Sequence, residues 1–285
     1  MQEFRLGCAV WSYRGWLGGF YPAGSAAKDF LKLYGDRLHA VEGNTTFYAV
    51  PSAETVQRWR EQTPEEFRFC LKFPKAVTHE GLLMPRLAEA QAFMERVKPL
   101  GDRLSCIFAQ LPPSYSPSQY GDLKNFLQTV TQAAIPIGVE VRHPQWFAEP
   151  HLSQLDTLLS HHNVTKVLLD TRPIYNCPDN PQAQSQRRKP NLPLYPTVTN
   201  HQAIVRFISH PNPIYNEQYL QEWLAQIQQW WSAGKSIQFF VHCPVEDHSP
   251  HTAKYFQEQL QAASLQIPPL PWQTLTPEPQ QLSLF

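Results

Sequence analysis

The sequence predicts an α/β fold, a (β/α)8 TIM-like barrel in which eight parallel strands alternate with helices and close into a ring. Two observations lead to this fold class: eight short apolar runs recur along the chain, and segments of helical periodicity separate most of them. Strands that alternate with helices form right-handed β-α-β units and therefore a parallel sheet. A third observation favours the barrel over an open doubly wound sheet, because no glycine-rich phosphate turn follows an early strand.

The elements follow one another in a regular order. The expected strands are Phe4–Val10, His39–Val41, Phe67–Leu71, Ser105–Ala109, Ile137–Val141, Lys166–Leu169, Ala203–Phe207 and Ile237–Val241. The expected helices are Ala26–Leu38, Ala53–Gln62, Arg86–Leu100, Gln119–Ala134, Leu152–His162, Glu217–Ala233 and Thr252–Ala263. Ser52 precedes the second of these helices and supplies an N-cap.

Two regions depart from this alternation. The crossover after the sixth strand, Thr171–Gln202, has no helical periodicity, and a loop of this length is typical of a lid, a binding loop or a partly disordered segment. Its charge cluster, Arg187-Arg188-Lys189, fits either a solvated surface or a contact with an anion. The last twenty residues contain five prolines. We therefore expect one barrel domain, residues 1–265, followed by an extended proline-rich tail, residues 266–285.

Composition restricts the class of protein. The chain has 285 residues with 24 basic and 24 acidic side chains, so its formal net charge is zero. A zero balance argues against a strong overall attraction to polyanions, although a local basic groove would be compatible with it. No apolar run is long enough to span a membrane, and the N-terminus lacks the apolar stretch of a secretory signal. The five cysteines form no C-x-x-C motif, so we expect buried thiols and a cytoplasmic protein.

Polar side chains are expected to gather at one end of the barrel. Alternate residues of each strand point inward, and the last inward residue reaches the C-terminal mouth, where such barrels carry their active sites. This rule places a polar or charged residue at seven of the eight strand ends. They are Glu42 with Asn44, Lys72, Gln110, Glu140 with Arg142, Asp170, Arg206 and His242.

This mixture of charges suits acid–base chemistry. Carboxylates beside cations stay ionised, whereas carboxyls against apolar walls are held as acids. We expect Glu42 and Glu140 to act as acid and base, with Asp170 in an electrostatic role. The alternative is that these charges only neutralise one another and have a purely structural role. The candidate substrate-binding residues are Trp11, Tyr13, Asn44, Tyr48, Lys72, His79, Gln110, Arg142, His143, Arg206 and His242.

No cofactor is predicted. His79 and His143 would need carboxylates such as Glu42 or Glu140 to complete a divalent metal site. No H-x-x-x-H or similar spacing indicates such a site.

Five motifs, in order, resemble the DUF72 (YecE-like) family. They are Trp11-Ser12-Tyr13 with Trp16 and Phe20-Tyr21-Pro22, Val41-Glu42-x-Asn44-x-Thr46-Phe47-Tyr48, Lys72-Phe73-Pro74 with Thr78-His79, Gln110-Leu111-Pro112-Pro113-Ser114, and Glu140-x-Arg142-His143-Pro144-x-Trp146-Phe147. The resemblance runs from about Gly7 to Ala263 and implies a TIM-like barrel with a reduced sixth crossover helix. It implies no reaction, because the family has no established activity. The family's Arg-x-His-Gly and Phe-Asn-Asn segments are replaced here, so no family role is carried over to Arg206 or His242.

The end of the chain resembles a second known motif. Gln281-Leu282-Ser283-Leu284-Phe285 is similar to the short peptide by which bacterial DNA-metabolism proteins dock on the replication sliding clamp. The resemblance implies that Gln281 forms a hydrogen bond and that two adjacent apolar anchors fill a pocket, so the expected partner-binding residues are Gln281, Leu282, Leu284 and Phe285. The alternative is that these apolar residues fold back onto the barrel.

Two classes of function follow from the sequence. The first is a hydrolase-like enzyme that acts by acid–base chemistry at the mouth on an anionic or polar substrate, which would be DNA-related if the tail docks on a clamp. Zero net charge and the missing metal spacing count against a nuclease, and a glycosidase is a rival because carboxylates and aromatic rings occur together. The second class is a non-catalytic module that binds nucleic acid or an anion and is recruited to the clamp.

Overall fold

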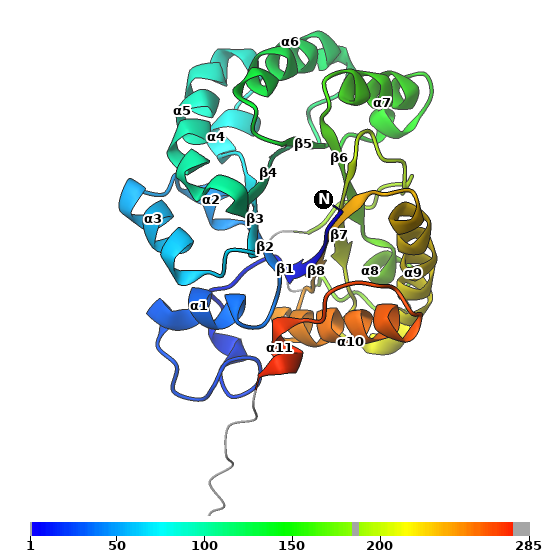
Figure 1. Ribbon diagram of the computed structural model, residues 1–285. Helices are drawn as coiled ribbons and strands as arrows, with labels where there is room; N and C mark the ends of the chain where they lie inside the picture. The colour runs from blue at the N-terminus through cyan, green and yellow to red at the C-terminus, as the bar shows by residue number, and fades with distance from the viewer. Residues whose placement is uncertain (1, 184–187, 276–285) are drawn as a thin grey trace, which may run out of the picture.

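Eight parallel strands close into a barrel in sequence order in the computed structural model, which describes residues 2–183 and 188–275 (Figure 1). The strands are β1 (Phe4–Cys8), β2 (Ala40–Gly43), β3 (Arg68–Lys72), β4 (Leu104–Gln110), β5 (Ile137–Glu140), β6 (Thr165–Asp170), β7 (Gln202–Ile208) and β8 (Ser236–His242). Each strand pairs with the next, and β8 pairs with β1 to complete the ring. The predicted fold class is confirmed.

Helices form a layer around the outside of this ring (Figure 1). The longer ones are α1 (Phe30–Gly35), α3 (Ala53–Gln62), α5 (Leu87–Val97), α6 (Tyr120–Val130), α7 (His151–His161), α9 (Glu217–Ser232) and α10 (Ser249–Ala262). Four are single turns: α2 (Thr45–Tyr48), α4 (Lys75–Thr78), α8 (Arg172–Tyr175) and α11 (Pro271–Thr274). Ser52 caps α3 as predicted, because its hydroxyl accepts the N–H of Thr55. Among the described residues, no helix combines the length and the apolar character that a membrane span requires.

Two apolar layers stabilise the barrel, one between the strands and the helices and one inside the ring. The inner layer consists of Ala40, Cys70, Cys106, Phe108, Val167, Ile204 and Phe240. These side chains are almost fully removed from water, so the barrel interior is a packed core. It forms an apolar floor beneath the polar residues at the carboxyl ends of the strands.

The crossover after β6 lacks a full-length helix within its described residues, as predicted. Only α8 follows β6, and the remaining described segments are irregular. Leu192 of the crossover packs on Leu169 and Ile208 at the ends of β6 and β7. The Thr171 hydroxyl donates to the carbonyl oxygen of Pro190 at 3.0 Å. These contacts hold the second half of the crossover close to the C-terminal mouth.

The described part of the predicted tail packs on the barrel. Leu270 is fully buried, and the side-chain amide of Gln257 donates to the carbonyl oxygen of Pro268 at 2.8 Å. The ring of Trp272 contacts Phe20 with a centroid separation of 4.9 Å. Residues 266–275 therefore extend the domain beyond the predicted boundary, whereas the pentapeptide Gln281–Phe285 lies outside the described residues.

Candidate active site at the barrel mouth

One arginine forms the centre of the mouth. Arg206 lies two residues beyond Ile204 of the inner core, so the alternation of β7 turns its side chain inward. Its Nε and Nη2 atoms contact the two carboxylate oxygens of Glu42 at 2.7 and 2.9 Å, and Nη1 contacts Glu140. Arg206 and Glu42 are fully buried. A single guanidinium therefore joins the carboxylates at the ends of β2 and β5.

Glu42 receives two more partners. Lys72 Nζ lies 2.9 Å from Glu42 Oε1 and donates to Gln110 Oε1 at 3.0 Å. His242 Nε2 lies 2.7 Å from Glu42 Oε2. Burial lowers the pKa of His242 to about 3, against the opposing effect of Glu42, so the neutral ring donates this hydrogen bond. Side chains from β3, β7 and β8 thus contact the carboxylate of Glu42 on β2.

Glu140 is held in the same way. Arg142 Nε contacts Glu140 Oε1 at 2.6 Å, and the second carboxylate oxygen faces Arg206. Burial alone would raise the pKa of Glu140, but Arg142, Arg206 and Lys72 outweigh it and lower the pKa to about 2. The same competition between burial and nearby cations, Arg206 foremost, lowers the pKa of Glu42 well below its usual range.

The two carboxylates are consequently fixed anions. Neither holds a proton near neutral pH, so neither is set up to act as the acid of an acid–base pair, contrary to the expectation for Glu42 and Glu140. A glycosidase mechanism requires a carboxyl with a raised pKa beside an ionised one. This pair does not supply that combination.

Asp170 lies on the other face of the sheet, which corrects its predicted position. The inward residues of β6 are Val167 in the inner core and Leu169, which is paired with Arg206. Asp170 follows Leu169 and points outward, where it accepts two hydrogen bonds from the Arg172 guanidinium, both 2.9 Å, and one from Trp223 Nε1 of α9, 2.7 Å. The sequence assignment failed because it took the last polar residue of the strand as an inward one.

The remaining predicted residues lie in the segments that follow the strands and make structural contacts there. Asn44 braces the loop after β2 by donating to the carbonyl oxygen of Ala9, and Trp11 packs edge-on against Trp59. Tyr13 donates to Asp247, Tyr48 packs on Phe47, and His143 accepts the N–H of Gln145. His79 also packs on Phe47. Burial and the nearby Arg142 lower the pKa of His79 to about 4, so it is neutral beside the mouth at pH 7.

Lys189 of the crossover is a mouth residue that the strand-end rule missed. Burial, followed by the positive charges of Arg206, Lys72 and Arg142, lowers its pKa to about 7, while Glu42 opposes this effect. Within the described parts of the chain, Nζ of Lys189 has neither a hydrogen-bond acceptor nor a carboxylate at ion-pair distance. The Arg187-Arg188-Lys189 cluster was the available signal in the sequence, but the position of Lys189 near the mouth depends on tertiary contacts.

Glu246 is the second missed residue. It lies in the 3-10 turn Glu246–His248 after β8, where Trp16 Nε1 donates to its carbonyl oxygen at 2.9 Å. Its Oε1 atom is buried and has no hydrogen-bond partner among the described residues. Burial raises the pKa of Glu246 to about 8, against the opposing effects of nearby Ser249 and then of Lys189. The mouth therefore holds a carboxyl that remains protonated near neutrality.

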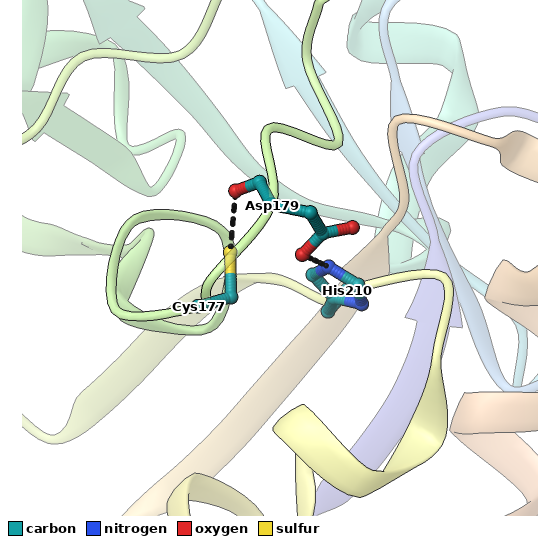
Figure 2. A group of neighbouring side chains, drawn as sticks. All are labelled: Cys177, Asp179 and His210. Atoms are coloured by element: carbon teal, nitrogen blue, oxygen red, sulfur yellow. Dashed lines mark hydrogen bonds and ion pairs between the residues drawn. The ribbon is translucent and has the colours of Figure 1, made fainter.

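Three potential metal ligands meet beside the end of β7, where Figure 2 shows Cys177 and Asp179 of the crossover next to His210. Their donor atoms lie within 4.8 Å of one another. However, His210 Nδ1 accepts the N–H of Asn212 at 2.9 Å, so the proton lies on Nε2, which donates to Asp179 at 3.0 Å. A metal would need the Nε2 lone pair of His210. The hydrogen bond from Nε2 to Asp179 instead connects the crossover to the segment after β7.

A parallel barrel with a buried charged cluster at its strand ends is the arrangement of TIM-barrel proteins, whose functional sites lie at this mouth. The chain belongs to the DUF72 family, because the model of that family, described as "Protein of unknown function DUF72", matches residues 5–279. It is 33% identical to the UPF0759 protein YecE of Escherichia coli K12. The alignment extends over 283 residues and covers 98% of this chain and 99% of the relative. The UPF0759 protein YunF of Bacillus subtilis 168 is 26% identical over 140 residues, 47% of this chain and 50% of the relative.

Solved structures share this fold. A DUF72 family protein from Thermotoga maritima is similar with a TM-score of 0.67 and 22% identity, covering 91% of this chain and all of the other. A DUF72 family protein from Enterococcus faecalis gives a TM-score of 0.66 at 19% identity, covering 92% and 98% of the two chains. At these identities the likeness supports the fold alone.

Proposed function

We propose that the chain is an enzyme that binds a small anionic substrate at the barrel mouth and acts on it by acid–base chemistry. One observation carries this proposal: within the described cluster, the cationic groups Lys72, Arg142 and Arg206 outnumber the two ionised carboxylates, and Lys189, with a pKa of about 7, adds further positive charge when protonated. Charges removed from water require partners, and the two carboxylates are already shared by three of these cations. An anion would offset the remaining positive charge.

The groups have separate roles in this proposal. Glu42 and Glu140 hold the guanidinium of Arg206 in place, while Lys189 and Arg142 approach the anion from the rim. Glu246 is the proton donor, because its raised pKa keeps it in the acid form near neutral pH. The reaction class is hydrolytic, and the cytoplasm is the expected compartment for a chain whose five cysteines are all free.

Anion binding can be tested without knowing the reaction. Inorganic phosphate and lactate are titrated into the full-length protein by calorimetry. Lys189→Gln should weaken binding roughly tenfold, the effect of losing one charge-assisted contact. The matched control is Lys98→Gln, because Lys98 lies exposed on the surface beside Glu95. Equal affinities for the two variants, or no binding of either anion at millimolar concentrations, would refute the proposal.

A recruitment role for the chain end is a separate proposal. The pentapeptide Gln281–Phe285 resembles a clamp-binding peptide, and it follows a described segment that is anchored on the barrel as far as α11. We propose that a bacterial sliding clamp binds these residues and brings the barrel to nucleic acid. Removing residues 281–285 should abolish binding to purified clamp. If the clamp binds and no anion is converted to a product, the barrel is a non-catalytic binding module that the clamp recruits. Wild-type protein that fails to bind the clamp at tens of micromolar would end this proposal.

A further inference from the structure

A polar layer lies at the N-terminal end of the barrel, on the other side of the apolar inner core from the mouth. The alternation that turns Cys70, Ile204 and Phe240 inward also turns inward the residues two positions before them. A register shift between β3 and β4 brings in Ser105, whose hydroxyl lies 2.9 Å from Oε1 of Gln238. The side chains of this layer are Arg5, which pairs with Gln238 across β1 and β8, and Arg68, Ser105, Gln202 and Gln238.

A cavity of about 190 Å³ lies along this layer, and all five of these side chains line it. Its lining includes two arginines, Arg5 and Arg68, but one carboxylate, Glu3. Glu66, whose charge also acts on Arg5, is exposed and lies outside the lining. The cavity therefore has more positive than negative charge on its walls.

Arg5 is the less satisfied of the two guanidinium groups. Its side chain is 12% exposed, and among the described residues its one polar contact joins Nη2 to Glu3 Oε1 at 3.1 Å. Its Nε atom is buried and has no hydrogen-bond partner in this part of the chain. Arg68 contacts the same oxygen of Glu3 and also donates to the carbonyl oxygens of Glu65 and Phe67. A guanidinium with several N–H donors and little contact with water requires more acceptors than one shared carboxylate oxygen.

Buried amides add neutral donors beside the arginines. Gln202 and Gln238 are 8% and 4% exposed. The hydroxyl of Thr165 donates to Oε1 of Gln202 at 3.2 Å, so the Nε2 group of Gln202 is left as a donor, and within the described ranges no residue accepts from it. A ligand with several acceptor oxygens would satisfy this amide and Arg5 together without displacing a protein partner.

We propose that this cavity is a binding site for a small free oxyanion of the phosphate or sulfate type. The oxygens of the anion accept hydrogen bonds from Arg5, Arg68 and Gln202, and its charge offsets the excess of cations. The volume of about 190 Å³ is smaller than the roughly 300–1,000 Å³ of pockets that hold cofactors and drug-sized ligands, which favours a free anion over the phosphate group of a larger molecule. The inner core separates this cavity from the mouth, so the inference is independent of the proposed function.

Anomalous diffraction tests the position of the anion in the unmodified protein. Crystals grown without phosphate or sulfate are soaked in millimolar selenate, whose selenium atom is located by its anomalous scattering. A selenium peak is expected in the cavity, with selenate oxygens within hydrogen-bond distance of the Arg5 guanidinium. An empty cavity overturns the proposal. A peak that appears only at molar selenate marks an adventitious ion only and overturns it as well.

Calorimetry with inorganic phosphate tests the same site in solution. Arg5→Gln keeps the pair between Arg68 and Glu3, and it should weaken binding at this site roughly tenfold or more, because charge-assisted hydrogen bonds are lost. Gln202→Met keeps every charge and should weaken binding by a smaller factor. Arg60→Gln is the matched control, because Arg60 is exposed on α3 and lies outside the cavity lining. Circular dichroism establishes that each variant is folded.

A phosphate ester tests the size limit. Glycerol 3-phosphate should bind at this site at least tenfold more weakly than inorganic phosphate, because the cavity is small. Equal affinities would overturn the assignment to a free anion.

Variants at the two ends of the barrel separate this inference from the proposed function. Lys189→Gln should leave the selenate peak beside Arg5 unchanged. If Lys189→Gln weakens phosphate binding while Arg5→Gln and Arg60→Gln bind alike, the N-terminal site is refuted and the anion site of the mouth stands. If Arg5→Gln weakens binding and Lys189→Gln does not, the N-terminal site stands and the proposed function fails. Absence of phosphate binding at millimolar concentrations refutes both.

Discussion

The two ends of the barrel use the same kind of ion pair in different surroundings. At the N-terminal end, Glu3 bridges Arg5 and Arg68 at 3.1 Å each, and its side chain is 31% exposed. At the C-terminal mouth, Glu42 bridges Arg206 and Lys72 and is fully removed from water. Water screens the first cluster, so its pairs contribute little to stability. The buried charges of the second cluster depend on their protein partners.

The difference separates two kinds of polar group at the mouth. A buried network whose members satisfy one another holds its geometry, but its atoms are already occupied. Among the described residues of the mouth, Nζ of Lys189 and the Oε1 atom of Glu246 have no hydrogen-bond partner. In the proposed function, the inner network is the rigid base and the outer groups contact the anion.

Removing the central cation should show the largest contrast between the two ends. Arg206→Met leaves Glu42 and Glu140 buried without their shared partner, and should lower the free energy of unfolding by about 3–5 kcal/mol. Arg68→Met at the solvated end should cost about 0–1 kcal/mol. Chemical denaturation of both variants measures the two losses. Similar losses would mean that burial does not distinguish the two ends.

A smaller effect should separate stability from ligand binding. Asp170→Asn weakens the hydrogen bonds to Arg172 and Trp223 on the outer face of the sheet, and should cost about 1–3 kcal/mol of unfolding free energy. Since Asp170 points away from the mouth, the affinity for phosphate should stay unchanged. Denaturation and calorimetry on the same sample give both values. A tenfold loss of phosphate affinity would show that Asp170 contributes to the anion site after all.

Sequence reasoning succeeded where geometry is periodic and failed where it is not. The alternation of strand residues has a strict period of two, so it placed Glu42, Glu140 and Arg206 at one mouth. The same period excludes Asp170, and the error came from taking the last residue of β6 as an inward one although Leu169 holds that position. Lys189 and Glu246 lie in loops, whose paths depend on contacts such as those of Leu192 and Trp16. No local pattern carries that information.

The smallest effect concerns the pH dependence of stability. The folded-state pKa of Glu246, about 8, exceeds that of an exposed glutamate, about 4.3. The folded state therefore binds the extra proton between these values, so the stabilisation is complete below about pH 4 and is lost as the pH rises toward 8. Glu246→Gln keeps the shape of the side chain but removes its titration. As the pH rises from 5 to 8, the unfolding free energy of the variant should therefore increase by about 1 kcal/mol relative to wild type, a figure reduced because the side chain is partly exposed.

Other groups make unfolding free energy rise with pH, but they do not obscure this measurement. The pKa values of His242 and Lys189 are lowered in the fold, so their contributions rise with pH from about 3 to 6.5 and from about 7 to 10.4 respectively. Both groups are present in wild type and variant, and their slopes largely cancel in the difference between the two unfolding free energies. Glu95→Gln on the exposed surface is the matched control and should show no such trend. If the stability difference between Glu246→Gln and wild type is the same at pH 5 and pH 8, Glu246 is ionised like a surface carboxylate and cannot be the proton donor of the mouth.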